Sequence, residues 1–452
     1  MQLGRYFVSI RLWLTLVVFS VSVPLVRAAD EPNISRGGEV SQDFSDISFY
    51  KPSPTTKTLI NAHAGNELHN VIFMIGDGMG AGQMMLSRIR ASGPGGRLYM
   101  ERLPVTGRVD TYPAGGLVTD SAASATAMAC GVKTINGMVG ITPEGVPQES
   151  LLEAAAGQGM RTGLVVTGAI ADATPAAFSA HVKRRDLQPA IAEQQLAQNI
   201  HVLLGGGRGH WIPMDVEGSL REDNRNLLEE ARKAGYAVIQ DRQELLQSQA
   251  DRVLGLFQVG GLATFAPEPT LEEMAAKAIE TLRRGGRNNR GFFLMVEGSK
   301  IDSACHRNDA DNCVRQTLLF DLAVKAAVDF AIQDGHTLVI VTADHETGGL
   351  IVATEEAEAF WTGSSHTAQP VSVLAYGPGA EVFGGVQDNT ELSRKTAWLM
   401  GLKKWPRALP QSLQERLNIS LPDKQRKAAE RRGSQPGPSY VSGSFSSAVG
   451  VR

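Results

Sequence analysis

Acidic and imidazole side chains come directly after several apolar runs of this 452-residue chain, or lie close to them. Carboxylates gathered at one place repel one another unless cations neutralise their charge, and divalent metals accept carboxylate and imidazole ligands. The pattern therefore predicts a site for divalent metal ions. Its candidate residues are Asp77, Asp172, Thr174, Glu297, Asp302, His306, Asp344, His345 and His366.

Two pairs in this set have informative spacing. Asp302 and His306 are four residues apart, so on a helix both side chains reach the same point, and an aspartate with a histidine suits zinc. An ordinary ion pair on a solvated helix face has the same spacing. Asp344 and His345 are neighbours and converge only where the chain leaves a strand. A strand-end turn capped by the aspartate is the alternative for that pair.

A serine stands at an expected helix start, in the segment TDSAASATA. Backbone N–H groups at a helix N-terminus favour negative charge, so the hydroxyl of Ser121 beside a metal could attack phosphorus. Simple capping of the helix by Asp120 or Ser121 explains the same residues. The local sequence does not separate the two interpretations.

An arginine completes the candidate chemistry. Arg185 ends the segment HVKRR and could clamp two phosphoryl oxygens with its planar guanidinium group. Plain surface charge is the alternative, and the neighbouring Arg184 competes for the same role.

The apolar runs predict the elements that position these residues. Expected strands cover residues 71–75, 162–167, 202–204, 292–296, 338–342 and 371–376. Expected helices cover residues 122–130, 188–198, 221–234, 271–283 and 314–332, and a helix after Asp388 closes the body. Continuous apolar strands that alternate with helices indicate an α/β fold with a large, mostly parallel central sheet sandwiched by helices. Such sheets bind ligands at the carboxyl ends of their strands, where the candidate residues stand.

The composition limits the possible function classes. A hydrophobic content of 42% and a charged content of 20% permit a large core and exclude wholesale disorder. The net charge of −3 includes basic segments at both ends, so the body between them is more acidic than that value suggests. Because no long run of charge appears, we expect no nucleic-acid recognition.

The N-terminus predicts export. Arg5 and Arg11 flank the start of an apolar stretch, and cleavage after Ala28 would remove residues 1–28 as a signal peptide. A membrane anchor is the alternative, but the stretch is short and Pro24 interrupts it. We therefore expect a periplasmic or secreted protein without a stable membrane span after signal removal.

The remaining chain divides into three parts. We expect residues 29–69 to be a polar N-terminal approach segment, residues 70–420 to form one large domain that carries the candidate site, and residues 421–452 to form a flexible basic tail.

Three cysteines remain to be placed. Cys305 and Cys313 lie eight residues apart and could pair in an exported protein. Cys130 sits in an alanine-rich run and reads as a small buried residue, and an odd count leaves at least one thiol unpaired.

Six segments in order resemble the alkaline phosphatase family. They run from about residue 70 to residue 402 and cover most of the chain between its ends. The segments are NVIFMIGDGMG at 70–80, TDSAASATAMACG at 119–131, Asp172–Pro175 with His181 and Arg185, Glu297–Asp302 with His306, TADH at 342–345, and His366-Thr367 followed by Ala375–Pro378.

The resemblance implies a role for each candidate residue. Ser121 would be the nucleophile that becomes a phosphoserine, and Arg185 would clamp the phosphoryl oxygens. The implied metal ligands are Asp302, His306 and His366 for one zinc; Asp77, Asp344 and His345 for a second zinc; and Asp77, Thr174 and Glu297 for a magnesium, with Asp172 behind it. The resemblance also implies phosphate monoesters as substrates, inorganic phosphate as a product, and a homodimer.

One position departs from the best-known bacterial pattern of the family. Ser303 stands where that pattern has a lysine that orders water and phosphate near the magnesium. We expect weaker retention of phosphate, faster product release and a less secure identity for the third metal.

Two other functions compete with this interpretation. A diesterase or sulfatase of the same superfamily is the first, but related diesterases commonly have threonine where this chain has Ser121, and no sulfatase motif is found. A secreted metal- or phosphate-binding protein without turnover is the second. Replacing Ser121 by alanine would separate an enzyme from a binding protein.

Overall fold

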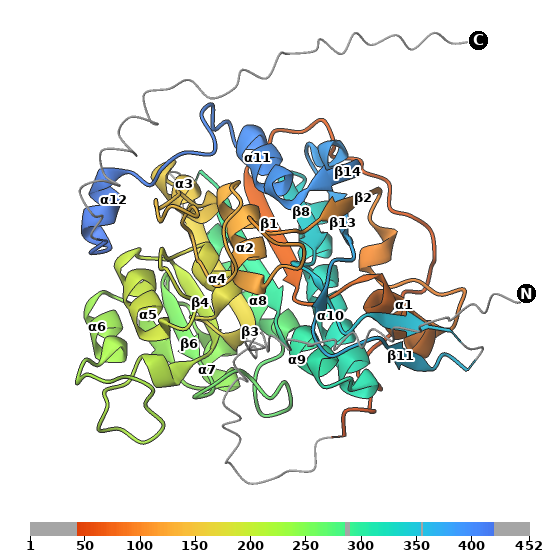
Figure 1. The fold of residues 1–452 in the computed structure, drawn as a ribbon, viewed down its shortest axis with the longest axis horizontal. Helices are drawn as coiled ribbons and strands as arrows, with labels where there is room; N and C mark the ends of the chain where they lie inside the picture. The colour runs from red at the N-terminus through yellow and green to blue at the C-terminus, as the bar shows by residue number, and fades with distance from the viewer. Residues whose placement is uncertain (1–42, 285–289, 354–355, 420–452) are drawn as a thin grey trace, which may run out of the picture. The chain divides into compact units, whose positions relative to one another are not determined.

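A computed structural model describes residues 43–284, 290–353 and 356–419 (Figure 1). Contacts divide the chain into Met1–Val40 and Ser41–Arg452, and the description concerns the second unit. The predicted signal peptide and the predicted basic tail, residues 421–452, lie outside the described residues. Within the described residues, no helix is both long enough and apolar enough to cross a membrane.

A ten-stranded sheet forms the centre of this unit, in the order β14-β2-β13-β8-β1-β7-β3-β4-β6-β5. All neighbouring strands are parallel except that β13 runs antiparallel to both β8 and β2. The mostly parallel sheet predicted from the sequence is therefore confirmed. The strands are β1 (Asn70–Gly76), β2 (Val105–Asp110), β3 (Arg161–Ala169), β4 (Val202–Gly206), β5 (Ala237–Ile239), β6 (Val253–Leu256), β7 (Phe292–Gly298), β8 (Thr337–Thr342), β13 (Val371–Tyr376) and β14 (Gly385–Asp388).

The central strands β1, β7 and β8 are mostly apolar because helices cover both faces of the sheet. Every residue of β1, β7 and β8 is buried. The register places Ile75 of β1 opposite Glu297 of β7 and Thr342 of β8, so the three strands end at nearly the same level. Residues that follow these strands consequently emerge at one edge.

Two groups of helices pack on the sheet (Figure 1). Strand β7 contacts helices of both groups: α8 and α10 belong to one group, and α3 and α4 belong to the other. The two groups lie on opposite faces of the sheet. The first group contains α1 (Ala81–Ser92), α8 (Leu271–Arg283) and α10 (Ala310–Asp334); the second contains α2 (Ser121–Cys130), α3 (Leu151–Gly157), α4 (Ala173–Ala177) and α11 (Asn389–Leu399).

The ends of α8 and α10 carry recognisable caps. Thr270 and Glu273 form a capping box at the start of α8, and Asp309 caps α10 by accepting from the backbone N–H of Asn312. Gly335 ends α10 in the left-handed conformation at φ 76°. These local signals explain why α8 covers the residues predicted for it.

The helix predicted over residues 221–234 is shorter in the structure. Helix α6 covers Leu227–Lys233 and begins after Asn226, whose side chain accepts from the N–H of Glu229. Arg221 instead lies in a loop, where its buried guanidinium group pairs with Glu193 and Asp223. Side-chain ion pairs in the loop therefore replace the first turns of the expected helix.

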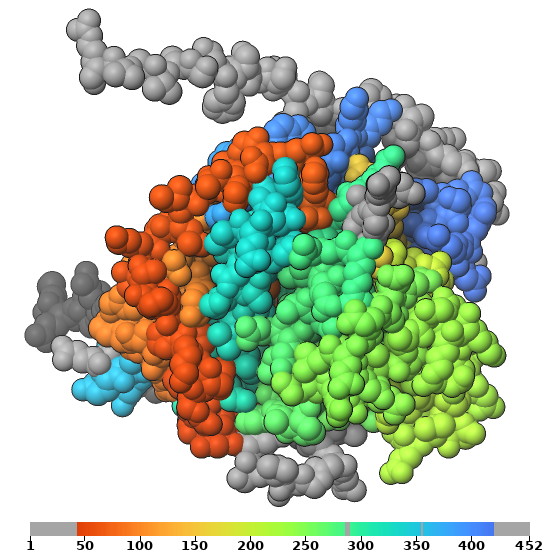
Figure 2. All heavy atoms as spheres, turned by 180° about the vertical axis from the view of Figure 1, so that it is seen from behind, coloured from red at the N-terminus to blue at the C-terminus, as the bar shows by residue number. Residues whose placement is uncertain are grey.

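The described part of the N-terminal approach segment packs against α10. The hydroxyl of Tyr50 donates to Asp321 at 2.7 Å, and Arg315 donates to the carbonyl of Asp46 at 2.9 Å. Figure 2 shows this red segment beside the teal segment that contains α10. Residues 43–50 therefore contribute to the folded unit.

Candidate active site

The candidate residues emerge where neighbouring strands end. Strands β8, β1, β7 and β3 are adjacent in the sheet, and their carboxyl ends are the expected ligand-binding edge. Asp77 follows β1, Glu297 is the last residue but one of β7, Asp172 and Thr174 follow β3 at the start of α4, and Asp344 and His345 follow β8.

A first group consists of Asp77, Asp344 and His345, all buried. His345 Nε2 lies 3.1 Å from Asp344 Oδ2 and 3.6 Å from Asp77 Oδ1. The other oxygen of Asp344 accepts from the backbone N–H groups of Gly78 and His345, at 3.0 and 2.9 Å. Backbone donors thus orient Asp344 so that Oδ2 turns toward the other two side chains.

The turn after β1 requires a glycine at position 78. Its φ of +73° is unfavourable for other residues, and a Cβ there would lie 2.8 Å from Thr347 Oγ1 and 2.9 Å from Asp302 Cα. The turn that presents Asp77 can therefore approach helix α9 (Lys300–His306) closely.

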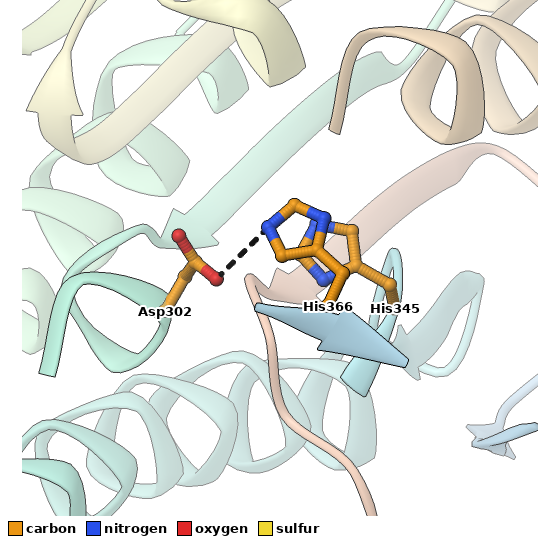
Figure 3. A group of neighbouring side chains, drawn as sticks. All are labelled: Asp302, His345 and His366. Carbon is orange, nitrogen blue, oxygen red and sulfur yellow. Dashed lines mark ion pairs between the residues drawn. The ribbon is translucent and has the colours of Figure 1, made fainter. Parts of the chain in front are cut away.

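A second group consists of Asp302, His345 and His366 (Figure 3). His366 Nε2 lies 3.5 Å from Asp302 Oδ1, and the rings of His345 and His366 stack with centroids 3.5 Å apart. His306 is close as well, with Nε2 3.2 Å from Asp302 Oδ2 and 3.1 Å from His366 Nε2. His345 therefore takes part in both groups, and His306 borders the second.

The hydrogen bonds of two histidines suit metal ligands. His306 Nδ1 faces the carbonyl of Ser364 at 2.7 Å, and His366 Nδ1 faces the carbonyl of Thr119 at 2.9 Å. A carbonyl accepts a hydrogen bond, so the proton of each neutral ring lies on Nδ1 and Nε2 keeps a lone pair. Both lone pairs are available to a metal between these rings and Asp302.

A third set of oxygens lies around Glu297. Within the described residues, Glu297 Oε2 and Thr174 Oγ1 are buried without a hydrogen-bond partner, as are Asp77 Oδ1 and Asp344 Oδ2. Buried polar atoms without partners are costly and call for an explanation such as an ion. Carboxylate and hydroxyl oxygens of this kind fit a hard cation such as magnesium, while the histidine-containing groups fit zinc.

The pKa shifts of two buried carboxylates also indicate a metal site. Burial, followed by the charge of Asp344, raises the pKa of Asp77 well above its usual value. Burial and the charges of Asp172 and Asp344 raise the pKa of Glu297 to about 8. Without a cation, these carboxylates cannot all be ionised, which supports their fit to divalent metals.

By contrast, the pKa values of Asp302 and His345 are shifted toward their charged forms. Burial would raise the pKa of Asp302, but the contacts of its carboxylate with the rings of His306 and His366 outweigh burial and lower the pKa well below its usual value. Burial would lower the pKa of His345, but the charge of Asp344 outweighs it and raises the pKa. Negative charge on Asp302 and positive charge on His345 therefore favour each other at the centre of the second group.

Ser121 is the first residue of α2 and is buried. Asp120 is the N-cap and accepts from the N–H of Ala123 at 2.9 Å, which leaves the serine hydroxyl unused by capping. Ser121 Oγ lies 3.2 Å from His345 Nε2. The structure thus places this hydroxyl beside the candidate metal ligands.

The two adjacent arginines face different surroundings. Arg184 is exposed and pairs with Asp186 at 2.5 Å. Arg185 lies between two carboxylates, with Nη1 3.6 Å from Asp120 Oδ2 and Nη2 3.5 Å from Asp172 Oδ1. Burial opposes its charge, but Asp172 and Asp120 outweigh it and raise the pKa of Arg185. Arg185, rather than Arg184, is the cation at the site.

The sequence profile of the alkaline phosphatase family matches residues 68–357. This chain belongs to the alkaline phosphatase family. It is accordingly a phosphatase, a metal-dependent hydrolase of phosphate monoesters.

Characterised relatives and solved structures agree with this membership. Alkaline phosphatase 4 of Bacillus subtilis is 35% identical over 413 residues, covering 72% of this chain and 87% of the relative. Alkaline phosphatase of Escherichia coli K12 is 32% identical over 425 residues, covering 77% and 89%. The structure of alkaline phosphatase from the Antarctic bacterium TAB5 superposes with a TM-score of 0.68 at 30% identity, covering 75% of this chain and 99% of that one.

Sequence reasoning missed one residue of the phosphatase site. Thr347 Oγ1 donates to Asp302 Oδ1 at 2.5 Å and lies 3.3 Å from His345 Nδ1. It belongs to strand β9 (Glu346–Thr347), which pairs with strand β12 (His366–Thr367) and brings His366 beside Thr347. Thr347 could have been predicted from its spacing of two residues from His345, since alternate residues of an extended chain share a face.

Proposed function

We propose that this phosphatase hydrolyses phosphate monoesters to an alcohol and inorganic phosphate through a phosphoserine on Ser121. The observation that carries the proposal is the position of the Ser121 hydroxyl. It is free of capping, lies 3.2 Å from His345 Nε2, and belongs to a helix N-terminus that favours a phosphoryl group.

The proposed reaction takes place in two displacements. Ser121 Oγ forms a bond to phosphorus while the bond to the ester oxygen breaks, and the alcohol leaves with a proton. Water then displaces the serine oxygen, and Ser121 recovers its proton as phosphate departs. Arg185 donates hydrogen bonds to two phosphoryl oxygens throughout, and Asp120 and Asp172 keep its guanidinium group in place.

Metal ions complete the proposed site. When bound, two zinc ions and one magnesium ion would neutralise phosphoryl charge, lower the pKa of the serine hydroxyl and of the attacking water, and stabilise the leaving oxygen. The proposed zinc ligands are Asp302, His306 and His366 for one ion and Asp77, Asp344 and His345 for the other; the proposed magnesium ligands are Asp77, Thr174 and Glu297, with Asp172 behind them.

The arginine favours monoesters over diesters. A monoester presents free phosphoryl oxygens to both N–H groups of Arg185, whereas the second ester group of a diester would occupy one of those positions. Because only the phosphoryl group is held, we expect a broad range of alcohols.

Further parts of the proposal concern the whole chain. Residues 1–28 would direct export to the periplasm or the medium, residues 29–69 would lead into the catalytic domain at 70–420, and residues 421–452 would follow that domain as a basic tail. The enzyme would act as a homodimer. It would have no stable membrane span once the signal peptide is removed.

Ser121→Ala tests the proposal. We expect hydrolysis of a phosphate monoester to fall by at least about a thousandfold, because the bond-forming oxygen is removed. Zinc and magnesium content should stay unchanged, since Ser121 is not a proposed ligand. Ser92→Ala is the matched control, because Ser92 lies in α1 and its hydroxyl donates to the Arg88 carbonyl of its own helix. Retained turnover in Ser121→Ala would disprove the phosphoserine.

A further inference from the structure

Cys305 and Cys313 face each other behind the proposed zinc site. Their Sγ atoms are 3.0 Å apart, and both residues are fully buried. Cys305 lies near the end of α9 and Cys313 lies in the first turns of α10. Bonded sulfur atoms are about 2.05 Å apart, so a small movement would join this pair.

The backbone around the two thiols is well supported. The N–H of Asn308 donates to the carbonyl of Cys305 at 3.0 Å, and the N–H of Cys313 donates to the carbonyl of Asp309 at 2.9 Å. These bonds close a tight turn between the two helices. The turn keeps the sulfur atoms opposed.

The sulfur pair also contacts residues that hold the proposed zinc ligands in place. Cys305 Sγ lies 3.8 Å from Gln83 Nε2, which donates to the carbonyl of Thr347 at 2.7 Å. Thr347 in turn donates to Asp302. His306 directly follows Cys305, so on α9 the thiol stands next to a proposed zinc ligand.

We propose that Cys305 and Cys313 form a disulfide while the exported chain folds, and that this bond holds the turn bearing His306. Because both sulfurs are buried in the finished fold, oxidation precedes its completion. The two thiols lose two protons and two electrons to a donor disulfide, which becomes two thiols by exchange. Cys130 remains reduced, since it is buried in α2 and faces the carbonyls of Gln148 and Ala177.

The expected effect of the disulfide on zinc retention rests on the proposed role of His306 as a zinc ligand. The disulfide itself does not depend on that role. A disulfide between α9 and α10 restricts the excursions that would carry His306 away from Asp302 and His366. Zinc should therefore leave the oxidised enzyme more slowly than the reduced enzyme.

Alkylation of the exported, full-length gene product tests the bond. The protein is purified without reductant, denatured, alkylated and weighed by mass spectrometry. We expect one alkylated cysteine, Cys130, and a cross-link between the peptides of Cys305 and Cys313, with three alkylated cysteines after reduction. Reduced chain refolded with oxidised glutathione should form the same bond, which separates a failure of export from a failure of the pairing. Three alkylated cysteines in both preparations would overturn the proposal.

Release of zinc to a chelator tests the effect on His306 without measuring turnover. We expect several-fold faster release from Cys313→Ala and from reduced enzyme than from oxidised enzyme. Cys130→Ala should release zinc at the rate of the oxidised parent, because it removes a buried thiol away from α9. Equal rates for Cys313→Ala and Cys130→Ala would overturn the link to His306. A chain that carries the bond but binds no zinc would refute the zinc assignment and leave the disulfide intact.

Discussion

Ser121 Oγ and His345 Nε2 lie 3.2 Å apart although 224 residues separate them in the chain. Ser124 reinforces this contact, since its hydroxyl donates to the carbonyl of Asp344 at 2.7 Å. Helix α2 is thereby joined to the segment that leaves β8, and the candidate nucleophile is fixed beside the candidate ligands. Preorganisation of this kind is what phosphoryl transfer requires most.

Arg185→Ala should weaken phosphate binding. Removing two charge-assisted hydrogen bonds to phosphoryl oxygens should raise KM and the inhibition constant of phosphate by about ten- to a hundredfold. Arg184→Ala is the matched control, because that side chain is exposed and paired with Asp186. Steady-state kinetics with phosphate as inhibitor measures KM and the inhibition constant for each variant. Equal effects of the two substitutions would contradict the assigned clamp.

Metal removal should make stability depend on pH. The pKa of Glu297 is raised from 4.5 to about 8, so without metal the folded chain holds a proton that the unfolded chain has lost. Stability of the chelated protein should therefore fall as pH rises from about 5 to 8, on the order of 4 kcal/mol. Bound metal should remove this slope, and Glu297→Gln should reduce it in the chelated protein. Thermal unfolding at several pH values measures the slope, and identical slopes with and without metal would refute the explanation.

A buried ion pair near the arginine segment should also show a pH signature. His181 Nε2 lies 2.9 Å from Glu153, Nδ1 lies 2.8 Å from the carbonyl of Gly140, and both side chains of the pair are inaccessible. Burial would lower the pKa of His181, but Glu153 outweighs it and raises the pKa above 6.5. Its stabilisation is complete below pH 6.5 and is lost as pH rises through the raised pKa.

His181→Ala should therefore lower stability by about 3–5 kcal/mol at pH 6, with a smaller difference from the parent at alkaline pH. His69→Ala is the control, since the pair of His69 with Glu67 is exposed and should contribute little. Denaturant unfolding at several pH values tests this. A pH-independent difference between His181→Ala and the parent would show that the pair is not ionised.

Ser303 is half-buried on α9 between Asp302 and Ala304. Ser303→Lys should place a cation near the phosphoryl group and tighten inhibition by phosphate by about tenfold. Ser303→Ala should leave inhibition unchanged, because it adds no charge. Unchanged or weaker inhibition in Ser303→Lys would disprove the role assigned to this position.

The elements predictable from the sequence are those buried on both faces. Strand β13 covers the six residues Val371–Tyr376 that the apolar run predicts. Strand β2 was not predicted, because its residues are mostly half-buried or exposed and include Gly107 and Arg108. Strands β5 and β14 are short and partly exposed, and β6 is buried but covers only four residues, so none of the three gives a clear pattern.

The sequence predicted which residues belong to the site better than it predicted how they gather into two groups of possible metal ligands. Asp77 and Asp344 could be found because they follow apolar strands. The sharing of His345 between two groups depends on how the chain turns after β8, and His366 is placed by a two-residue strand paired with β9. Such geometry comes from tertiary packing, and no local pattern encodes it.

Parallel hydrolysis of p-nitrophenyl phosphate and bis-p-nitrophenyl phosphate tests the central claim most directly. The protein is assayed from pH 7 to 11 with added zinc and magnesium, after chelation, and as Ser121→Ala. The account predicts monoesterase activity that rises at alkaline pH, is lost on chelation and in Ser121→Ala, and far exceeds activity on the diester. A preference for the diester, or monoester hydrolysis that survives both chelation and Ser121→Ala, would contradict it.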